Sequence, residues 1–67
     1  MFKEYFKNVG IEFKVARIRK GLSCQEVSEL AKLSMDTICR IENGTDGKLS
    51  TYKRVADALG VPLRDIL

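Results

Sequence analysis

Histidine is absent from this chain of 67 residues, and cysteine occurs only twice, at Cys24 and Cys39. The commonest general base of enzymes and the commonest metal ligand are therefore missing, and two cysteines cannot complete a four-ligand zinc site. A disulfide between the two would be unusual in a reducing cytosol, so we expect free thiols. These absences remove most hydrolase arrangements. We expect a protein that is not an enzyme and that uses no metal and no other cofactor.

Long hydrophobic runs are missing as well. The longest apolar stretches, such as residues 59–63, extend over only a few residues, whereas a membrane-spanning helix needs about 20. Residues 1–8 lack the uninterrupted apolar segment and the small-residue cleavage site of a secretory signal. We therefore expect no contact with a membrane and a cytoplasmic location.

The composition that remains is that of one small folded domain. Apolar residues make up 45% of the chain, which is too much for a disordered segment. A chain of this length buries about 60% of its unfolded surface, so we expect residues 1–67 to form a single domain with a modest core. The net charge of +3 is uneven, because residues 23–47 carry two basic and five acidic side chains and the segments on either side are basic.

The spacing of apolar residues predicts a long helix at the start of the chain. Six residues follow one another at intervals of three or four, the stripe of a helix with 3.6 residues per turn: Phe2, Phe6, Val9, Phe13, Ala16 and Lys20. The helix is expected to reach Lys20, with Gly21 as its C-cap. Its start is open between Phe2 and Asn8, since asparagine is a good N-cap.

Two short helices separated by a tight turn are predicted in the middle of the chain. Ser23 and Glu26 have the spacing of a capping box, and Ser34 is a second N-cap residue. The helices are expected over residues 24–31 and 35–42, with only two residues and the cap between them.

The C-terminal third predicts two further helices. One carries four residues on a common face and ends at a glycine: Tyr52, Val55, Ala56, Leu59 and Gly60. Residues 62–67 begin with a proline, which the first turn of a helix tolerates, and their apolar side chains are spaced to pack back onto the core. The whole pattern predicts an all-α fold, a compact bundle of five helices without strands.

Two helices joined by a tight turn form a helix-turn-helix, whose second helix lies in the major groove of DNA. Residues 21–44 closely resemble the phage-repressor family (Cro/repressor, Xre-type), and the run Arg-Ile-Glu-Asn-Gly at 40–44 is the most specific part of the likeness. The resemblance extends from Gly10 to Val61. It implies a lambda-repressor-like DNA-binding fold and a sequence-specific transcriptional regulator of the repressor type.

The resemblance places base-contacting side chains at Met35, Asp36 and Arg40. An arginine can donate two hydrogen bonds to guanine, an aspartate can accept one from cytosine N4, and a methionine can contact the methyl group of thymine. The helical wheel agrees for Asp36 and Arg40, which lie opposite the face of Ile38 and Ile41. It places Met35 at the border of the two faces, near the helix N-terminus, where helix-turn-helix proteins have base-contacting side chains. The alternative is a polar face that is only solvated.

Contacts with the DNA backbone come from hydroxyls, amides, cations and helix N-termini. The matching positions are Ser23, Cys24, Thr37, Asn43 and Lys48. Cys24 replaces the family's usual glutamine, so at this position the amide nitrogens are the expected donors. Asn43 fits a helix-end residue equally well, and Lys48, in the place of the next helix's cap, fits a solvated side chain.

Two further expectations concern the scaffold. On their helices Arg17 and Glu42 both point toward the edge of the interior and should pair, and the resemblance implies the same buried ion pair. Lys32 stands in the turn where this family usually has glycine. A left-handed residue other than glycine costs about 1–2 kcal/mol unless the turn differs.

The predicted partners are double-stranded DNA and a second copy of the chain. A homodimer on a palindromic operator is expected because one recognition helix reads too few bases. The alternative is a protein–protein interaction module, adaptor or antitoxin-like, that keeps the scaffold without specific DNA binding. Ile11, Val15 and Ile18 lie on the side of the first helix opposite its core stripe and need a cover. The candidates are the last segment, a partner subunit or a C-terminal extension.

Overall fold

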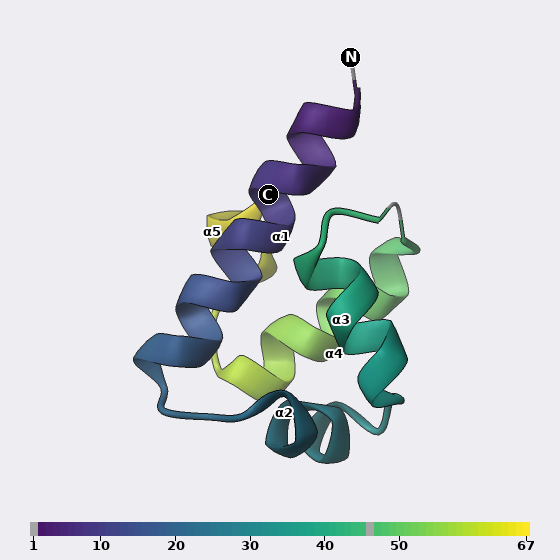
Figure 1. The fold of residues 1–67 in the computed structure, drawn as a ribbon. Helices are drawn as coiled ribbons and strands as arrows, with labels where there is room; N and C mark the ends of the chain where they lie inside the picture. Colours follow the sequence, from purple (N-terminus) through teal and green to yellow (C-terminus); the bar gives the residue numbers. More distant parts are fainter. Residues whose placement is uncertain (1, 46) are drawn as a thin grey trace.

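The computed structural model describes residues 2–45 and 47–67, with the side chains of residues 2 and 3 left aside. In this part of the chain there are five α-helices and no strand, which confirms the fold class expected from the sequence (Figure 1). The helices are α1 (Phe2–Arg19), α2 (Cys24–Ala31), α3 (Met35–Glu42), α4 (Leu49–Leu59) and α5 (Leu63–Ile66). None of them is both long and apolar enough to cross a membrane.

The apolar stripe of α1 is confirmed in its described part. The helix begins at Phe2, so Asn8 is not its N-cap. The side chain of Phe2 itself lies outside the described residues. Four side chains of the stripe are buried in the core or packed against it: Phe6, Val9, Phe13 and Ala16.

α1 ends at Arg19, one residue earlier than the spacing predicted. The N–H of Leu22 donates to the carbonyl oxygen of Arg17 at 3.1 Å, and Gly21 between them has a φ of 69°. This left-handed closure turns the chain away before Lys20 can continue the helix. Lys20 is accordingly exposed and does not belong to the buried stripe.

A single hydrophobic core joins all five helices. The rings of Phe13 on α1 and Tyr52 on α4 lie near its centre, with their centroids 5.7 Å apart, a distance at which aromatic pairs add to packing. The other buried members come from every helix: Val9, Val27, Ile38, Ile41, Val55, Ala56, Leu59 and Ile66. α5 thus packs back onto the core, as its apolar spacing predicted.

Two glycines let α1 lie directly on the C-terminal end of α3. A Cβ added to Gly10 would stand 2.5 Å from the carbonyl oxygen of Ile41, and one added to Gly44 would stand 2.7 Å from the Cα of Lys7. Gly44 also has a φ of 88°, which disfavours any other residue. The end of α3 is therefore held by backbone contact with α1.

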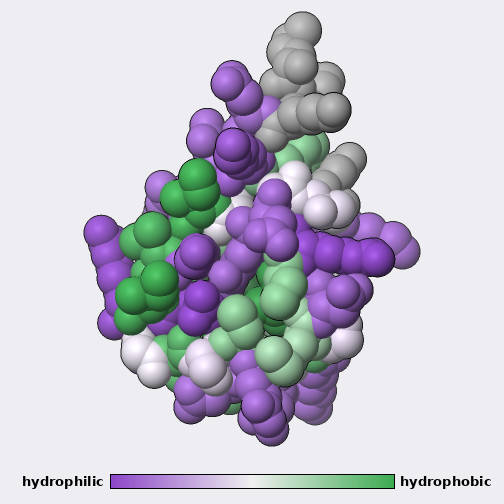
Figure 2. Space-filling view, viewed as in Figure 1, coloured by the Kyte–Doolittle hydropathy of each residue, from purple (hydrophilic) through white to green (hydrophobic). Residues whose placement is uncertain are grey.

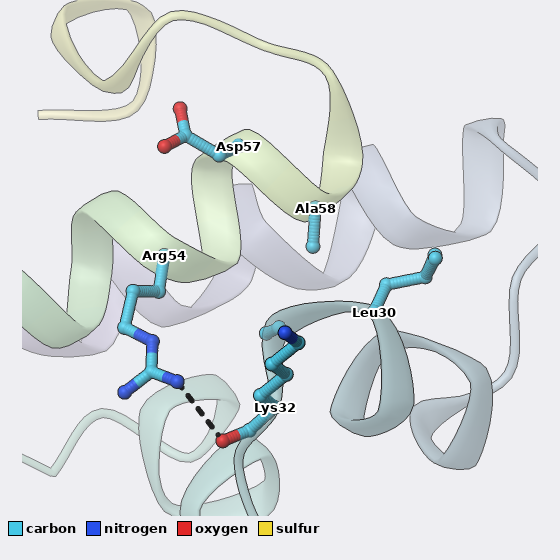
Figure 3. A pocket seen from close by; sticks show the side chains of 6 residues that line it. Leu30, Lys32, Arg54, Asp57 and Ala58 are labelled. Carbon is cyan, nitrogen blue, oxygen red and sulfur yellow. Dashed lines mark hydrogen bonds between the residues drawn. The ribbon is translucent and has the colours of Figure 1, made fainter.

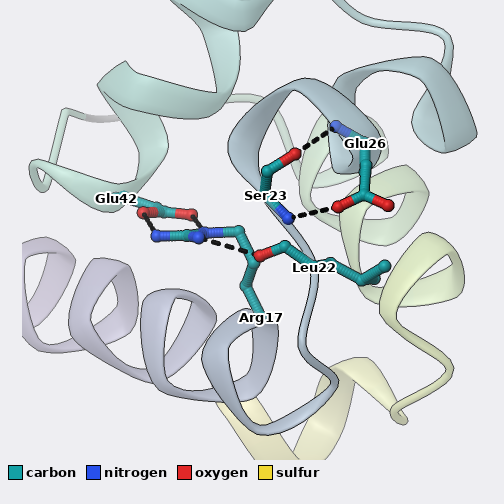
Figure 4. Close-up of polar contacts among 5 residues, drawn as sticks. All are labelled: Arg17, Leu22, Ser23, Glu26 and Glu42. Carbon is teal, nitrogen blue, oxygen red and sulfur yellow. Dashed lines mark hydrogen bonds and ion pairs between the residues drawn. The ribbon is translucent and has the colours of Figure 1, made fainter.

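An ion pair joins the same two helices (Figure 4). Nε of Arg17 donates to Oε2 of Glu42 at 2.8 Å and Nη2 donates to Oε1 at 3.2 Å, while Nη1 donates to the carbonyl oxygen of Leu22 at 3.0 Å. The two side chains are only 14% and 10% exposed. The hydrogen bond with Glu42 raises the pKa of Arg17 above its ordinary value. The pairing predicted from the helical positions is confirmed.

We expect Arg17→Met and Glu42→Gln to lower the free energy of unfolding by about 3–5 kcal/mol each, because each leaves the other charge stranded in the interior. The double variant should cost much less than the sum of the two, since it strands no charge. Urea denaturation of the four proteins measures the coupling. Strictly additive losses would contradict this account of the pair.

Candidate nucleic-acid interface

α2 and α3 are started by side-chain caps, as the sequence predicted. The N–H of Glu26 donates to Oγ of Ser23 at 3.1 Å, and Oε1 of Glu26 accepts from the N–H of Ser23 at 2.9 Å (Figure 4). At α3, Oγ of Ser34 accepts from the N–H of Thr37 at 3.2 Å. Each cap satisfies a backbone donor that the first turn leaves free. The two helices have the bounds expected from these caps.

The turn between α2 and α3 keeps a left-handed conformation although it lacks glycine. Lys32 has a φ of 57° and a ψ of 45°. The N–H of Leu33 returns to the carbonyl oxygen of Ser28 at 2.9 Å, and Nη2 of Arg54 on α4 donates to the carbonyl oxygen of Lys32 at 3.1 Å (Figure 3). The turn therefore keeps the left-handed conformation in which a residue other than glycine is strained. The hydrogen bonds around Lys32 hold it in this conformation.

α3 has one buried face and one exposed face. Ile38 and Ile41 are 1% and 4% exposed. On the opposite side, Asp36 and Arg40 are exposed. Met35, at the first helical position and on the border between the two faces, is 47% exposed. All three side chains that the sequence assigned to base contacts thus lie on the surface of α3.

Asp36 and Arg40 form an ion pair along this face. Nε of Arg40 lies 3.1 Å from Oδ2 of Asp36, and the two side chains are 69% and 76% exposed. Such an exposed pair is worth about 0–1 kcal/mol. The aspartate thus positions the guanidinium. Because breaking this ion pair costs little free energy, the guanidinium remains available to another acceptor.

Beside α3 lies an open hollow of about 290 Å³. Thr37, Arg40 and Lys48 line it together with the hydroxyl residues Thr45 and Thr51. Hydroxyls and cations are the groups that hold phosphate oxygens. The sequence analysis did not identify Thr45 and Thr51. Thr51 on α4 comes three residues after Lys48, the N-cap residue, and this spacing of one helical turn could have indicated that the two side chains lie on the same side.

The loop that forms one side of the hollow is tied to α4 by Tyr52. Its hydroxyl accepts from the N–H of Gly47 at 3.0 Å and lies 3.4 Å from the carbonyl oxygen of Thr45, to which it donates. Lys48 follows directly as the N-cap residue of α4, exposed and without a side-chain capping bond. The backbone that carries the Lys48 side chain is therefore held in place by the hydrogen bonds of Tyr52.

The remaining predicted contacts lie outside this hollow. Asn43 is the exposed C-cap residue of α3. Ser23 and Cys24 stand at the N-terminus of α2, where Ser23 is exposed and Cys24 is half-buried. Burial, with the nearby Glu42 carboxylate, raises the pKa of the Cys24 thiol, so this thiol stays neutral near pH 7 and adds no negative charge to the surface.

Two further features of the described part of the chain lie apart from this surface or are missing from it. No group of three or more acidic or cysteine side chains is placed to hold a metal ion there. A second open hollow of about 410 Å³ lies between α2 and α4 (Figure 3). It contains none of the residues predicted for DNA contacts, and Leu30, Arg54 and Asp57 are among its lining side chains.

Comparison with known proteins agrees with this geometry. A family model described as a helix-turn-helix domain matches residues 8–66. The restriction-modification controller protein C.AhdI from Aeromonas hydrophila has a similar structure, with a TM-score of 0.91 at 23% identity over 96% of this chain and 98% of that one. The clp gene regulator ClgR from C. glutamicum has a TM-score of 0.85 at 21% identity over 98% of this chain and 83% of that one. No curated protein matches the chain.

We expect Lys32→Gly to raise the free energy of unfolding by up to about 1 kcal/mol, because glycine adopts the left-handed conformation without strain but loses more entropy on folding. Lys32→Ala is the matched control, since it removes the same side chain and keeps the Cβ. Thermal denaturation should show a higher midpoint for the glycine variant than for the alanine variant. Equal midpoints would mean that the turn is not strained.

Proposed function

Because the chain belongs to the helix-turn-helix domain family, we propose that it is a sequence-specific, repressor-like transcriptional regulator that places α3 in the major groove of double-stranded DNA. The observation that carries this proposal is the two-sided character of α3. Its apolar side is buried to within a few per cent, while Asp36 and Arg40 project from the opposite side and Met35 is exposed at the border between the two. A helix held in this way can present side chains to base edges.

Three exposed residues of α3 have distinct tasks in base reading. Arg40 can donate two hydrogen bonds to guanine O6 and N7, and Met35 can contact a thymine methyl group. Asp36 can accept from cytosine N4, and its ion pair with Arg40 at 3.1 Å holds the guanidinium in place until a base replaces the carboxylate. The exchange is inexpensive because both side chains are exposed.

Phosphate contacts would flank α3 on both sides. On one side lie Ser23 and the first amides of α2 at Cys24, where the helix dipole favours an anion. On the other side lies the hollow, with Thr37 and Lys48 among its lining residues, and Asn43 stands at the end of α3. Since the segment 23–47 is itself acidic, the few cations here and the helix N-termini carry the attraction to phosphate, and binding should be modest in affinity and weaken as the salt concentration rises.

The bound form would be a homodimer on a palindromic operator. One α3 can read only a few base pairs, which is too little to select a site among the competing sequences of a genome. A two-fold pair places two recognition helices about 34–36 Å apart, one turn of DNA.

A second candidate function rests on the same acidic charge. Five acidic side chains in residues 23–47 against two basic ones would also suit a scaffold that binds a basic protein partner, as an adaptor or antitoxin does. This module would show no specific DNA binding, so one experiment separates the two candidates.

The decisive experiment is selection and sequencing from a random DNA pool at two salt concentrations, with Arg40→Ala in parallel. We expect a palindromic motif for the unaltered protein. In the variant, preference at one position of each half-site should relax, with a loss of about 1–3 kcal/mol on the selected site and little loss on random DNA. No enrichment at low salt would favour the protein-binding module, and an equal loss on random DNA would contradict base reading by Arg40.

Lys48→Ala tests the phosphate contacts. It should weaken binding to all sequences alike and reduce the slope of log affinity against log salt by about one, because one fewer counterion is released. Lys53→Ala is the control on the same helix, since Lys53 pairs with Asp57 at 2.7 Å and does not line the hollow. An unchanged slope for Lys48→Ala would leave this lysine as a solvated side chain.

A further inference from the structure

The outer side of α1 is only partly covered by the rest of the chain. Val15 is half-buried beside Val61 and Ile66, around a hollow of about 190 Å³ between α1 and the C-terminal segment. Ile11 and Ile18 remain 47% and 59% exposed. The last segment therefore covers Val15 in part. The two isoleucines, which precede and follow Val15 along α1, remain about half exposed.

These exposed side chains belong to one face. Ile11, Val15 and Ile18 follow one another at intervals of four and three, so they form a second stripe on α1, distinct from the stripe in the core. Figure 2 shows hydrophobic side chains gathered over the visible side of α1, bordered by hydrophilic ones. An apolar stripe rimmed by polar residues is the usual mark of an interaction surface. We call these three residues the outer stripe.

The charges beside the outer stripe fit a second copy of the same helix. Glu12 and Arg19 both lie on the flank of α1 that lines the hollow with Asp65 of α5, and they are seven residues apart. If two α1 helices pack antiparallel about a two-fold axis, this flank meets the same flank of the other copy, with the order of residues reversed. Glu12 of each copy then faces Arg19 of the other, so opposite charges meet twice.

The opposite flank does not prevent this pairing. Lys14 lies there and is exposed, and a lysine can carry its ammonium group into solvent on a long flexible stem. Opposite charges thus meet twice on the first flank, whereas the lysine on the second flank can turn away from its counterpart in the other copy. The charge pattern therefore favours self-association over an unrelated partner.

We propose that the outer stripe is the homodimer interface, in which α1 packs antiparallel against α1 of a second copy. Ile11, Val15 and Ile18 form its apolar centre, and Glu12 pairs with Arg19 of the other copy at each end. The inference deepens the proposed function and rests on it for the expectation that two copies act together.

The position of the interface suits two recognition helices on one DNA duplex. α3 packs against the other side of α1, where Gly10 and Arg17 meet its C-terminal end. Joining two copies at the outer stripe therefore places the two α3 helices away from the two-fold axis. The protein measures 21 and 19 Å along its shorter axes, so helices near the outer sides of a pair can stand about 34 Å apart, as adjacent half-sites require.

The size of the stripe sets the expected strength. Three apolar side chains from each copy lie at the low end of interface areas, below about 1,200 Å² in total, the size typical of weak and transient contacts. The dimer should therefore form at tens of micromolar protein and be strengthened by DNA, because two adjacent half-sites hold the copies together.

Sedimentation equilibrium on the unaltered chain tests the interface. At about 50–100 µM the average mass should approach twice 7.6 kDa, and Ile18→Glu should return it to the monomer value. Leu30→Glu is the matched control, because Leu30 on α2 is 58% exposed and lies away from α1. Circular dichroism should show both variants folded. A monomeric unaltered chain, or dissociation by Leu30→Glu as well, would overturn the proposal.

A charge exchange tests the geometry itself. Glu12→Arg and Arg19→Glu should each weaken the dimer at least tenfold, since each places like charges opposite one another at both ends. The double variant should restore dimerisation, because the opposite charges meet again in exchanged positions. Failure of the double variant to recover would show that α1 does not pack antiparallel against itself.

The interface and the proposed function fail in different ways. A dimer that obeys both tests yet selects no DNA would leave the interface standing and remove the DNA-binding function. Selection of a palindrome by a chain whose dimer survives Ile18→Glu would keep the function and remove this interface.

Discussion

The ion pair between Arg17 and Glu42 is the interaction on which the position of the candidate DNA-binding surface depends. Through it α1 holds the C-terminal end of α3, and the third hydrogen bond of the guanidinium, to the carbonyl oxygen of Leu22, holds the segment just before α2. The pair therefore joins the long helix to both halves of the helix-turn-helix. Because removing two charges from water is costly, the pair should add little net stability, and we expect it to act mainly by favouring one arrangement of the helices. The backbone contact at Gly10 permits the close approach that the pair requires.

Much of this scaffold could be predicted from the sequence because the information is local. Ser23 with Glu26, and Ser34 before α3, specify helix starts through hydrogen bonds to residues three positions away, and the structure contains these bonds. The pairing of Arg17 with Glu42 followed from their angular positions on two helices. The likeness to a known family then supplied the roles of the α3 residues, which helix geometry alone does not assign.

Other features depend on tertiary geometry and were not predictable in the same way. The hydroxyl of Tyr52 ties down the loop before α4, and only the folded chain brings Thr45 and Thr51 to the hollow beside α3. The sequence predicted an α1 one residue too long at its C-terminal end, because the spacing of apolar residues does not indicate where the left-handed turn at Gly21 ends the helix. The sequence did not decide what covers the outer stripe. In the structure the C-terminal segment packs beside Val15, while Ile11 and Ile18 remain exposed.

The central claim is that the exposed face of α3 and its flanks contact DNA. Amide chemical shifts of the isotope-labelled protein, followed by nuclear magnetic resonance while a duplex carrying the selected motif is added, test it most directly. The account predicts large shifts at residues 23–24, 35–40, 43–45 and 47–48. Shifts confined to α2 and α4 around Leu30 and Arg54, with α3 unchanged, would contradict it.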